Sequence, residues 1–269
     1  PGATIIELPE DLAEHDTDKG PISVTPTRRP AADYKAVAQA VEVIAGAKNP
    51  IILAGNGAVR KRASTQLRRL AQKAGIGVVN TFMGKGAVAR TDEHCLYTIG
   101  LQGRDHVNEA LDDADVVISV GYDLVEYAPN FWNKHGGKKI VHIDFWPAEI
   151  DEDYPVVVDI AGDIADALWQ INEKLNESHS DQLPLWDIAD RADLRQRISD
   201  DFAMEKDDAS FPMKPQKVLW DVREVMGPND ILLSDVGAHK MWISRYYQCD
   251  EPNTCLISNG FCTMGFAFP

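Results

Sequence analysis

The stretch Ser234–His239 carries residue types that are well suited to holding an anion. It reads Ser-Asp-Val-Gly-Ala-His, overlaps the end of an expected strand over 231–235, and leads into an expected helix from Ala238 onward. A strand end, a glycine turn and a helix start would expose backbone N–H groups, and His239 adds a side-chain donor. These groups would stabilise a phosphate. An ordinary turn with a solvated histidine accounts for the same residues equally well.

A second glycine-containing turn follows close to the end of the chain. The run Ile257–Gly265 reads Ile-Ser-Asn-Gly-Phe-Cys-Thr-Met-Gly. Gly260 and Gly265 would let the backbone approach a ligand closely, with Met264 between them as an apolar wedge. Ordinary packing of the methionine is the alternative.

Two further glycine turns resemble nucleotide-binding loops only in part. Gly55-Asn56-Gly57 follows an expected strand, but Arg60 stands at the third glycine position and no acidic residue ends a strand about 20 residues later. We favour a tight turn there, with a nucleotide site as the alternative. The run Met83–Gly86 lacks the leading glycine and the Ser or Thr of a P-loop, which argues against hydrolysis of a nucleoside triphosphate.

The cysteines and His142 are residue types that could bind a metal. The four cysteines are Cys95, Cys249, Cys255 and Cys262. Separations of six and seven residues between the last three do not match the short pairs of a zinc site, so we expect reduced, buried thiols. His142 lies in an apolar strand and is expected to be a hydrogen-bonded core residue, whereas Asp144 ends that strand, where ligands gather in open sheets.

Charge and composition restrict the class of partner. The chain has 269 residues and a formal net charge of -15, with 44% hydrophobic residues. Such an acidic excess disfavours nucleic acid and anionic membrane surfaces, and no apolar run reaches the roughly 18 residues of a membrane helix. The N-terminus has neither Met nor a signal region. We therefore expect a soluble, cytoplasmic protein, and an excised piece of a longer one.

Helices and strands alternate regularly through the middle of the sequence. Helices are expected over 34–47, 60–74, 107–114 and 163–175, and strands over 50–54, 76–81, 115–120, 139–144 and 156–160. Strands without apolar/polar alternation are covered on both faces, so the fold class is α/β with a doubly wound parallel sheet.

The flanking regions have a different character. Residues 1–9 read as a short apolar strand without a nearby partner, and 176–210 as a polar, partly helical linker. After Pro212 come helices over 215–226 and 238–247 with strands over 231–235 and 254–258. Two strands do not make a stable doubly wound sheet, so this unit is expected to be the start of a second α/β domain.

Four segments, taken with their order and spacing, resemble the thiamine-diphosphate-dependent 2-oxoacid enzymes, and within them the acetolactate synthases. These segments are Pro1–Glu10, Gly121–Trp132, Asp235–Tyr247 and Ile257–Pro269. The resemblance implies three α/β domains per subunit, of which the first binds the cofactor's pyrimidine and the last its diphosphate. It assigns 1–10 to the last strand of the pyrimidine-binding domain, 11–32 to a linker, 33–175 to the middle domain, 176–210 to a linker, and 211–269 to the N-terminal part of the diphosphate-binding domain.

The same resemblance implies roles for particular residues. Gly237, Ala238 and His239 match the loop that contacts the diphosphate, although Ala238 stands where many relatives have Gln. Met264 matches the apolar wedge that bends the cofactor. The backbone of Cys262 and Met264 matches positions that hydrogen-bond the aminopyrimidine. No catalytic side chain is implied within these 269 residues.

The implied cofactors are thiamine diphosphate and Mg2+. The family's metal-binding Gly-Asp-Gly run does not occur in the sequence and is expected after Pro269, and the glutamate that protonates the pyrimidine is expected before Pro1. The chain alone is therefore expected to be inactive. The segment Gly121–Tyr127 resembles the FAD-independent, acetoin-producing branch more than the biosynthetic one, and FAD remains the minority alternative.

The implied reaction is a decarboxylating condensation of pyruvate with a second 2-oxoacid, as in acetoin or branched-chain amino acid formation. A homodimer or homotetramer is implied, because such enzymes place the cofactor between subunits. One alternative is a thiamine enzyme of the pyruvate oxidase or decarboxylase type. Another is a non-catalytic nucleotide-binding module, for FAD or NAD, built on residues 33–175.

Overall fold

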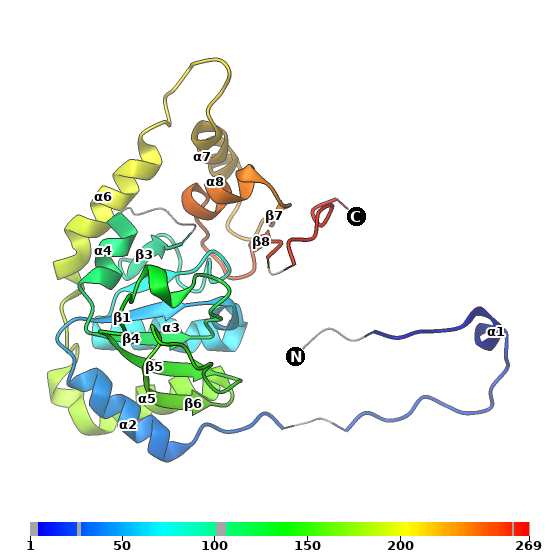
Figure 1. Ribbon diagram of the computed structural model, residues 1–269, viewed down its shortest axis with the longest axis horizontal. Helices are drawn as coiled ribbons and strands as arrows, with labels where there is room; N and C mark the ends of the chain where they lie inside the picture. The colour runs from blue at the N-terminus through cyan, green and yellow to red at the C-terminus, as the bar shows by residue number, and fades with distance from the viewer. Residues whose placement is uncertain (1–4, 26–27, 101–105, 260, 269) are drawn as a thin grey trace.

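A six-stranded parallel sheet forms the centre of the molecule (Figure 1). A computed structural model describes residues 5–25, 28–100, 106–259 and 261–268. The strand order is β3-β2-β1-β4-β5-β6. The strands are β1 Pro50–Ala54, β2 Val78–Asn80, β3 Cys95–Thr98, β4 Val116–Val120, β5 Lys139–Asp144 and β6 Val156–Ala161. The doubly wound parallel sheet is confirmed, with β3 as a strand that the sequence pattern did not predict.

Helices cover both faces of this sheet. They are α2 Tyr34–Ala45, α3 Lys61–Ala74, α4 His106–Asp112 and α5 Ile164–His179. The Asp33 carboxylate caps α2, where it accepts hydrogen bonds from Lys35 N at 2.8 Å and Ala36 N at 3.0 Å. Strands β1 and β4 are buried along their whole length, as expected for strands covered on both sides.

Short 3-10 helices and α1 complete the regular elements of the described residues up to Arg191. They are α1 Glu10–Ala13, η1 Asn56–Val59, η2 Pro129–Phe131, η3 Ser180–Gln182 and η4 Ile188–Arg191. The strand expected over residues 1–9 is not formed in its described part, and its assignment to the last strand of a neighbouring domain stays a prediction. Residues 5–9 have no regular structure, and Ile5 is 92% exposed, because no strand within the described ranges pairs with them. Residues 5–25 run away from the sheet (Figure 1).

The segment 176–210, expected from its composition to be a polar linker, packs against the sheet domain. Helix α6 spans Ala192–Ala203 and contacts α4 and β3. Its buried side chains are Leu194, Ile198 and Phe202, which belong to the same apolar core as the sheet. Spacing of four residues places all three on one helix face. The expected partly helical linker thus also covers one edge of the sheet domain.

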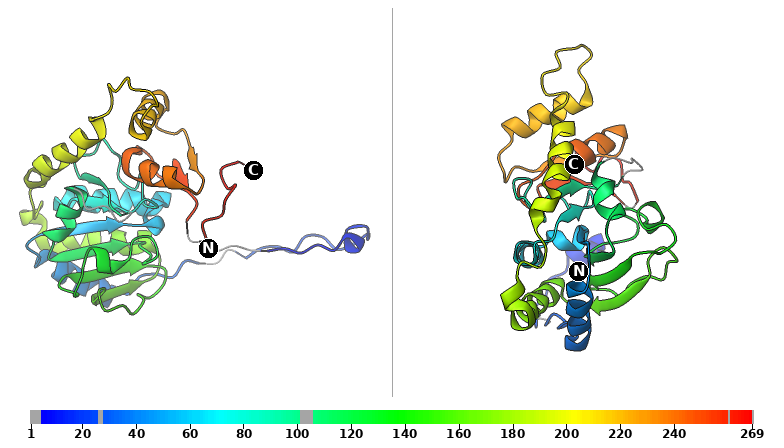
Figure 2. Two further views of the ribbon diagram at one scale, coloured as in Figure 1. Left: turned by 45° about the horizontal axis from the view of Figure 1, so that its top comes forward. Right: turned by 90° about the vertical axis from the view of Figure 1, so that its left-hand side faces the viewer.

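A second, smaller unit follows. It contains α7 Pro215–Val225, β7 Leu232–Ser234, α8 Ala238–Tyr246 and β8 Cys255–Ile257, with β7 and β8 paired in parallel. The unit lies against the β3 side of the large sheet (Figure 2). Two hydrogen bonds fix it there, because the Arg245 guanidinium donates to the carbonyl oxygens of Thr98 and, at 3.2 Å, Gly100.

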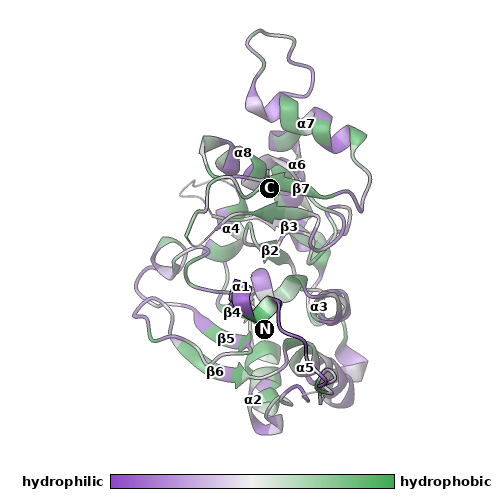
Figure 3. Cartoon of the chain, turned by 90° about the vertical axis from the view of Figure 1, so that its right-hand side faces the viewer, coloured by the Kyte–Doolittle hydropathy of each residue, from purple (hydrophilic) through white to green (hydrophobic). Residues whose placement is uncertain are grey.

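The distribution of hydropathy agrees with this packing. The central strands are largely hydrophobic, whereas α7 alternates hydrophobic and hydrophilic residues (Figure 3), as a helix with one buried face does. None of the helices in the described ranges combines the length and the apolar character that a membrane span requires.

The loops after β1 and β4 cross at very short distance. A Cβ atom on Gly55 would lie 2.5 Å from the carbonyl oxygen of Gly121, and one on Gly57 would lie 2.6 Å from Gly121 Cα. Gly57 N also donates to Gly121 O at 2.8 Å. These contacts account for Gly55 and Gly57 as packing residues, which supports the tight turn rather than a nucleotide loop.

Candidate functional site

The carboxyl ends of β7 and β8 bring the predicted cofactor residues to one edge. The loop after β7 contains Gly237, and the loop after β8 contains Met264. The Asp235 carboxylate joins the two loops: one oxygen accepts from Val236 N at 2.8 Å and the other from Gly265 N at 2.8 Å. This contact holds the Met264 loop against the start of α8.

The start of α8 has the features of an anion site. No side chain caps the helix, and its N-cap residue is Gly237 with a φ of 151°. Ala238 and His239 are exposed, and the His239 imidazole is 3.0 Å from the carbonyl oxygen of Asp235. A Cβ on Gly237 would lie 2.8 Å from that imidazole. Glycine therefore leaves room for the His239 ring beside the uncapped helix N-terminus, whose backbone N–H groups fit a diphosphate group.

Asp235 adds a negative charge beside this site. The backbone N–H groups of Val236 and of Gly265 lower the pKa of its carboxyl, so it is ionised at neutral pH. A carboxylate next to an anion is unfavourable unless a cation accompanies the anion. The site thus suits a diphosphate bound to a divalent cation better than a metal-free diphosphate. Within the described residues, no group of three or more acidic, His or Cys side chains could hold a metal by itself.

The loop after β8 exposes its apolar side chain. Met264 is 79% exposed, so it does not pack into the core as the alternative required. The loop is held from within by the Ser258 hydroxyl, which donates to Thr263 O at 3.1 Å. Lys240 of α8 donates to the Asn259 side chain at 2.8 Å. Met264 therefore stands on an anchored loop with its side chain available to a ligand.

The expectation of four buried thiols is wrong for one of them. Cys95, Cys249 and Cys255 are buried, but Cys262 is exposed. Cys262 has a φ of +49° and lies two residues before Met264 in the loop after β8, whose described residues 261–266 are exposed. The implied role of Cys262 involves its backbone and is unaffected by this exposure.

His142 is a hydrogen-bonded core residue, as predicted. It is buried, with Nδ1 3.0 Å from the Tyr154 hydroxyl and Nε2 3.2 Å from Trp146 O. Both ring nitrogens have partners, so the residue is not poised as a metal ligand. Asp144, at the end of the same strand, has its carboxyl pKa raised by burial.

Lys85, in the motif that lacked a P-loop pattern, is a buried structural lysine. Its Nζ donates to Thr98 Oγ1 at 2.9 Å and to Tyr247 O at 2.8 Å. Burial lowers the pKa of this amine. A Cβ on the preceding Gly84 would lie 2.1 Å from Ala54 O, so that glycine serves close packing. Lys85 thus joins the sheet domain to the second unit.

Sequence reasoning missed Glu126, a buried carboxylate at the point where the sheet order reverses between β1 and β4. It accepts from Asn56 N at 3.0 Å and is hydrogen-bonded to the Thr81 hydroxyl. Burial raises its pKa to about 7, against the lowering effect of these hydrogen bonds. Ligands bind at such reversal points in open α/β sheets. Its only sequence signal is its position shortly after a strand end.

Glu126 makes the free energy of unfolding of the protein depend on pH. Its folded-state pKa lies above the ordinary value, so the folded state binds the proton more tightly and its contribution to stability falls as pH rises from about 5 to 7. We expect Glu126→Gln to be more stable than the unmodified protein by about 2 kcal/mol at pH 8 and nearly equal to it at pH 5. Urea denaturation of both proteins at the two pH values measures this. Equal gains at both would contradict the raised pKa.

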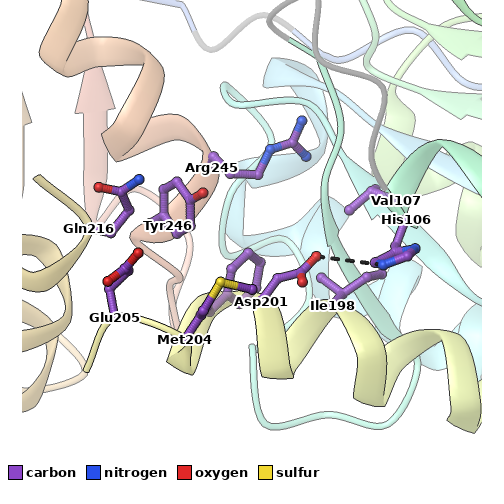
Figure 4. A pocket seen from close by; sticks show the side chains of 10 residues that line it. His106, Val107, Ile198, Asp201, Met204, Glu205, Gln216, Arg245 and Tyr246 are labelled. Atoms are coloured by element: carbon purple, nitrogen blue, oxygen red, sulfur yellow. Dashed lines mark ion pairs between the residues drawn. The ribbon is translucent and has the colours of Figure 1, made fainter. Parts of the chain in front are cut away.

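A separate pocket of about 310 Å³ lies between α6 and α8 (Figure 4). Its lining includes His106, Asp201, Glu205 and Arg245, and His106 Nε2 is 3.9 Å from the Asp201 carboxylate. None of the predicted cofactor residues lines it. The pocket is therefore distinct from the edge formed by the β7 and β8 loops.

Comparison with known proteins decides the family. Residues 37–171 match the thiamine pyrophosphate enzyme central domain, and residues 235–269 match the C-terminal TPP binding domain of the same enzymes. The chain belongs to the thiamine pyrophosphate enzymes. The second match begins at Asp235, so both loops of the candidate site lie within the TPP-binding match.

Curated relatives of this thiamine pyrophosphate enzyme are acetolactate synthases. The chain is 31% identical to acetolactate synthase of Bacillus subtilis, over 100% of this chain and 47% of the relative. It is also 31% identical to a probable acetolactate synthase large subunit of Methanococcus aeolicus, over 100% of this chain and 48% of the relative. The large subunit of Corynebacterium glutamicum is 30% identical, with 44% of its length covered. The chain thus spans about half the length of the curated relatives it matches.

Proposed function

We propose that the whole protein is an acetolactate synthase that condenses pyruvate with a second 2-oxoacid, using thiamine diphosphate and Mg2+. The observation that carries this proposal is the Asp235–Gly265 contact, which brings an uncapped helix N-terminus and an exposed methionine to one edge. Both lie in the region that matches a TPP-binding domain. The names of the curated relatives support the specific reaction.

The residues of this chain would bind and orient the cofactor. When bound, thiamine diphosphate supplies the carbanion that adds to the 2-oxoacid carbonyl and accepts the electrons released with CO2. Gly237, Ala238 and His239 would hold the diphosphate by backbone donors and an imidazole. Met264 would act as the apolar wedge that favours a bent cofactor, and the backbone of Cys262 and Met264 would hydrogen-bond the aminopyrimidine. The metal ligands would come from residues outside the described site.

We propose further that the sheet domain does not hold FAD. The reversal point between β1 and β4 is taken up by the crossing of Gly57 over Gly121 and by the buried Glu126 carboxylate. In its ionised form the Glu126 carboxylate also disfavours a pyrophosphate. Retention of FAD by the purified protein at about one equivalent per chain would contradict this part of the proposal.

The remaining expectations concern the whole protein. We propose that residues 1–10 form the last strand of a pyrimidine-binding domain, where they would find the partner strand that residues 5–9 lack among the described ranges. A cytoplasmic homodimer or homotetramer that contributes to acetoin or branched-chain amino acid formation completes the proposal.

The experiment uses the full-length protein with thiamine diphosphate, Mg2+ and pyruvate. We expect the unmodified protein to form acetolactate. His239→Ala should bind thiamine diphosphate roughly tenfold more weakly, because one hydrogen bond to a charged group is lost. His179→Ala, on α5 in the sheet domain, is the matched control and should bind normally. Acetaldehyde as the main product, or pyruvate-dependent oxygen uptake, would instead identify a decarboxylase or an oxidase. Failure of both cofactor binding and acetolactate formation would overturn the proposal.

A further inference from the structure

A negative side chain stands at the edge where the proposed function puts a diphosphate. Asp235 directly follows β7, and hydrogen bonds from backbone N–H groups, that of Val236 first, lower the pKa of its carboxyl. Charges of the same sign that lie close together repel each other. A carboxylate at this place is therefore unfavourable for an anion unless it does something that a neutral side chain cannot do.

The two oxygens of this carboxylate serve two different loops. One accepts from Val236 N at 2.8 Å, in the turn that leads into α8, and the other accepts from Gly265 N at 2.8 Å, in the loop after β8. An ionised aspartate offers two acceptor oxygens and no donor. Asparagine has the same shape but only one acceptor oxygen, so it cannot accept both bonds.

The backbone on both sides of Met264 is tied to the ends of the two strands. Before it, Thr263 O accepts from the Ser258 hydroxyl at 3.1 Å, and after it, Gly265 N donates to Asp235. The Met264 side chain is exposed, so its own packing within this chain does not hold it. The two hydrogen bonds therefore set where the methionine stands.

The rest of this loop offers little packing that could replace them. Residues 261–266 are exposed, and the Phe261 side chain is exposed completely. Gly265 has a φ of +79°, and among the described residues nothing beyond its chain neighbours lies within 4 Å of a Cβ position there. The position of the loop thus depends on hydrogen bonds.

Two side-chain hydrogen bonds join this loop to α8 and the turn before it, within the part of the chain that the structure describes. Lys240 Nζ donates to Asn259 Oδ1 at 2.8 Å, five residues before Met264. Gly265 N donates to Asp235 beside Met264 itself. Asp235 is therefore the side chain that fixes Met264 relative to the start of α8.

We propose that Asp235 is a positioning residue that couples the diphosphate-binding start of α8 to the methionine wedge. The inference rests on the proposed function. Asp235 acts through Gly265: it fixes the separation between the backbone donors for the diphosphate and the side chain that favours the bent cofactor. Groups that are placed before the cofactor binds need no ordering during the reaction, which favours a high kcat.

Asp235→Asn in the full-length protein tests this with a minimal change. Its one acceptor oxygen should stay with Val236 N, because a bond between adjacent residues orders no second segment, and Gly265 N then loses its acceptor. We expect kcat for acetolactate formation, at saturating thiamine diphosphate, Mg2+ and pyruvate, to fall roughly tenfold. Cofactor affinity should change by less than about threefold, because the donors at the start of α8 are kept.

Asp230→Asn is the matched control. Asp230 precedes β7, at the opposite end of the strand from Asp235, and its carboxylate accepts from Gly227 N at 2.7 Å. The same chemical change in the same unit should leave kcat unaltered. Urea unfolding of both variants checks that they are folded.

A double substitution shows whether Asp235 acts through Met264. With Met264→Ala the wedge is already absent, so adding Asp235→Asn should lower kcat further by less than about twofold. Two residues that act independently would instead give a further loss of roughly tenfold, the full effect of Asp235→Asn alone.

A nitroxide spin label on Cys262 gives a readout that needs neither cofactor nor activity. Cys262 is exposed and lies two residues before Met264, whereas Cys95, Cys249 and Cys255 are buried. Without cofactor, the label should be more mobile in Asp235→Asn than in the unmodified protein and in Asp230→Asn. Cys262→Ser reports any label attached elsewhere.

Three results would overturn the proposal. They are an unchanged label mobility in Asp235→Asn, full kcat of that variant at saturation, and independent effects in the double substitution. If the unmodified protein forms no acetolactate, the proposed function fails, and the spin label still decides whether Asp235 holds the loop.

Discussion

Gly121→Ala is expected to lower the free energy of unfolding by about 3 kcal/mol or more. Gly121 has a φ of +57°, and its missing Cβ would lie 2.4 Å from Gly57 Cα and 2.6 Å from Ala58 N. Both atoms belong to the backbone of the loop after β1, so neither can rotate away as a side chain would. Strain at a positive φ adds to this collision.

Gly137→Ala is the matched control for this prediction. Nothing lies within 4 Å of the Cβ position at Gly137, so its substitution should change stability by less than about 0.5 kcal/mol. Urea unfolding of the full-length protein, followed by tryptophan fluorescence, measures both variants. Equal midpoints for the two would show that the loops after β1 and β4 do not cross as closely as described. Gly121→Ala should also disturb Glu126, since the same two loops enclose its carboxylate.

The central sheet could be predicted because its strands are continuous apolar runs. The strand over 139–144 matches β5, since Lys139 and Asp144 bound a buried run in which His142 is the one polar residue. By contrast, β3 has four residues, Cys95–Thr98, and is too short to give a periodic signal. Helix α6 carries Leu194, Ile198 and Phe202 at intervals of four, but charged neighbours dilute that pattern. Tertiary packing, rather than local propensity, determines such elements.

The candidate site was predictable only in its local parts. The strand end, Gly237 and the start of α8 follow from residues adjacent in sequence. The contact of Asp235 with Gly265 spans 30 residues, and that of Lys85 with Tyr247 spans 162. A single sequence carries no signal for such distant contacts, because periodicity reports only which face of an element is buried. Glu126, whose partners Asn56 and Thr81 lie 70 and 45 residues away, was missed for this reason.

Removing the Met264 side chain is expected to lower kcat while leaving the free energy of unfolding nearly unchanged. Met264 is 79% exposed, and its loop is anchored by Asp235 and Ser258 rather than by the methionine. Met264→Ala should therefore change the free energy of unfolding by less than about 0.5 kcal/mol. Under the proposed function the side chain holds the bound cofactor in its reactive conformation, so kcat for acetolactate formation should fall roughly tenfold to a hundredfold, the loss of about 1.4 to 2.7 kcal/mol of positioning.

Three measurements distinguish a positioning role from simple affinity. Met264→Leu keeps most of the apolar volume and should keep most of kcat, because volume-conserving apolar exchanges preserve contacts. Met213→Ala removes an exposed methionine just before α7 and should leave kcat unchanged. Titration with thiamine diphosphate completes the test. If Met264→Ala only weakens cofactor affinity and regains full kcat at saturation, Met264 contributes binding energy without imposing a conformation, because a residue that bends the cofactor must lower kcat even when every site is filled.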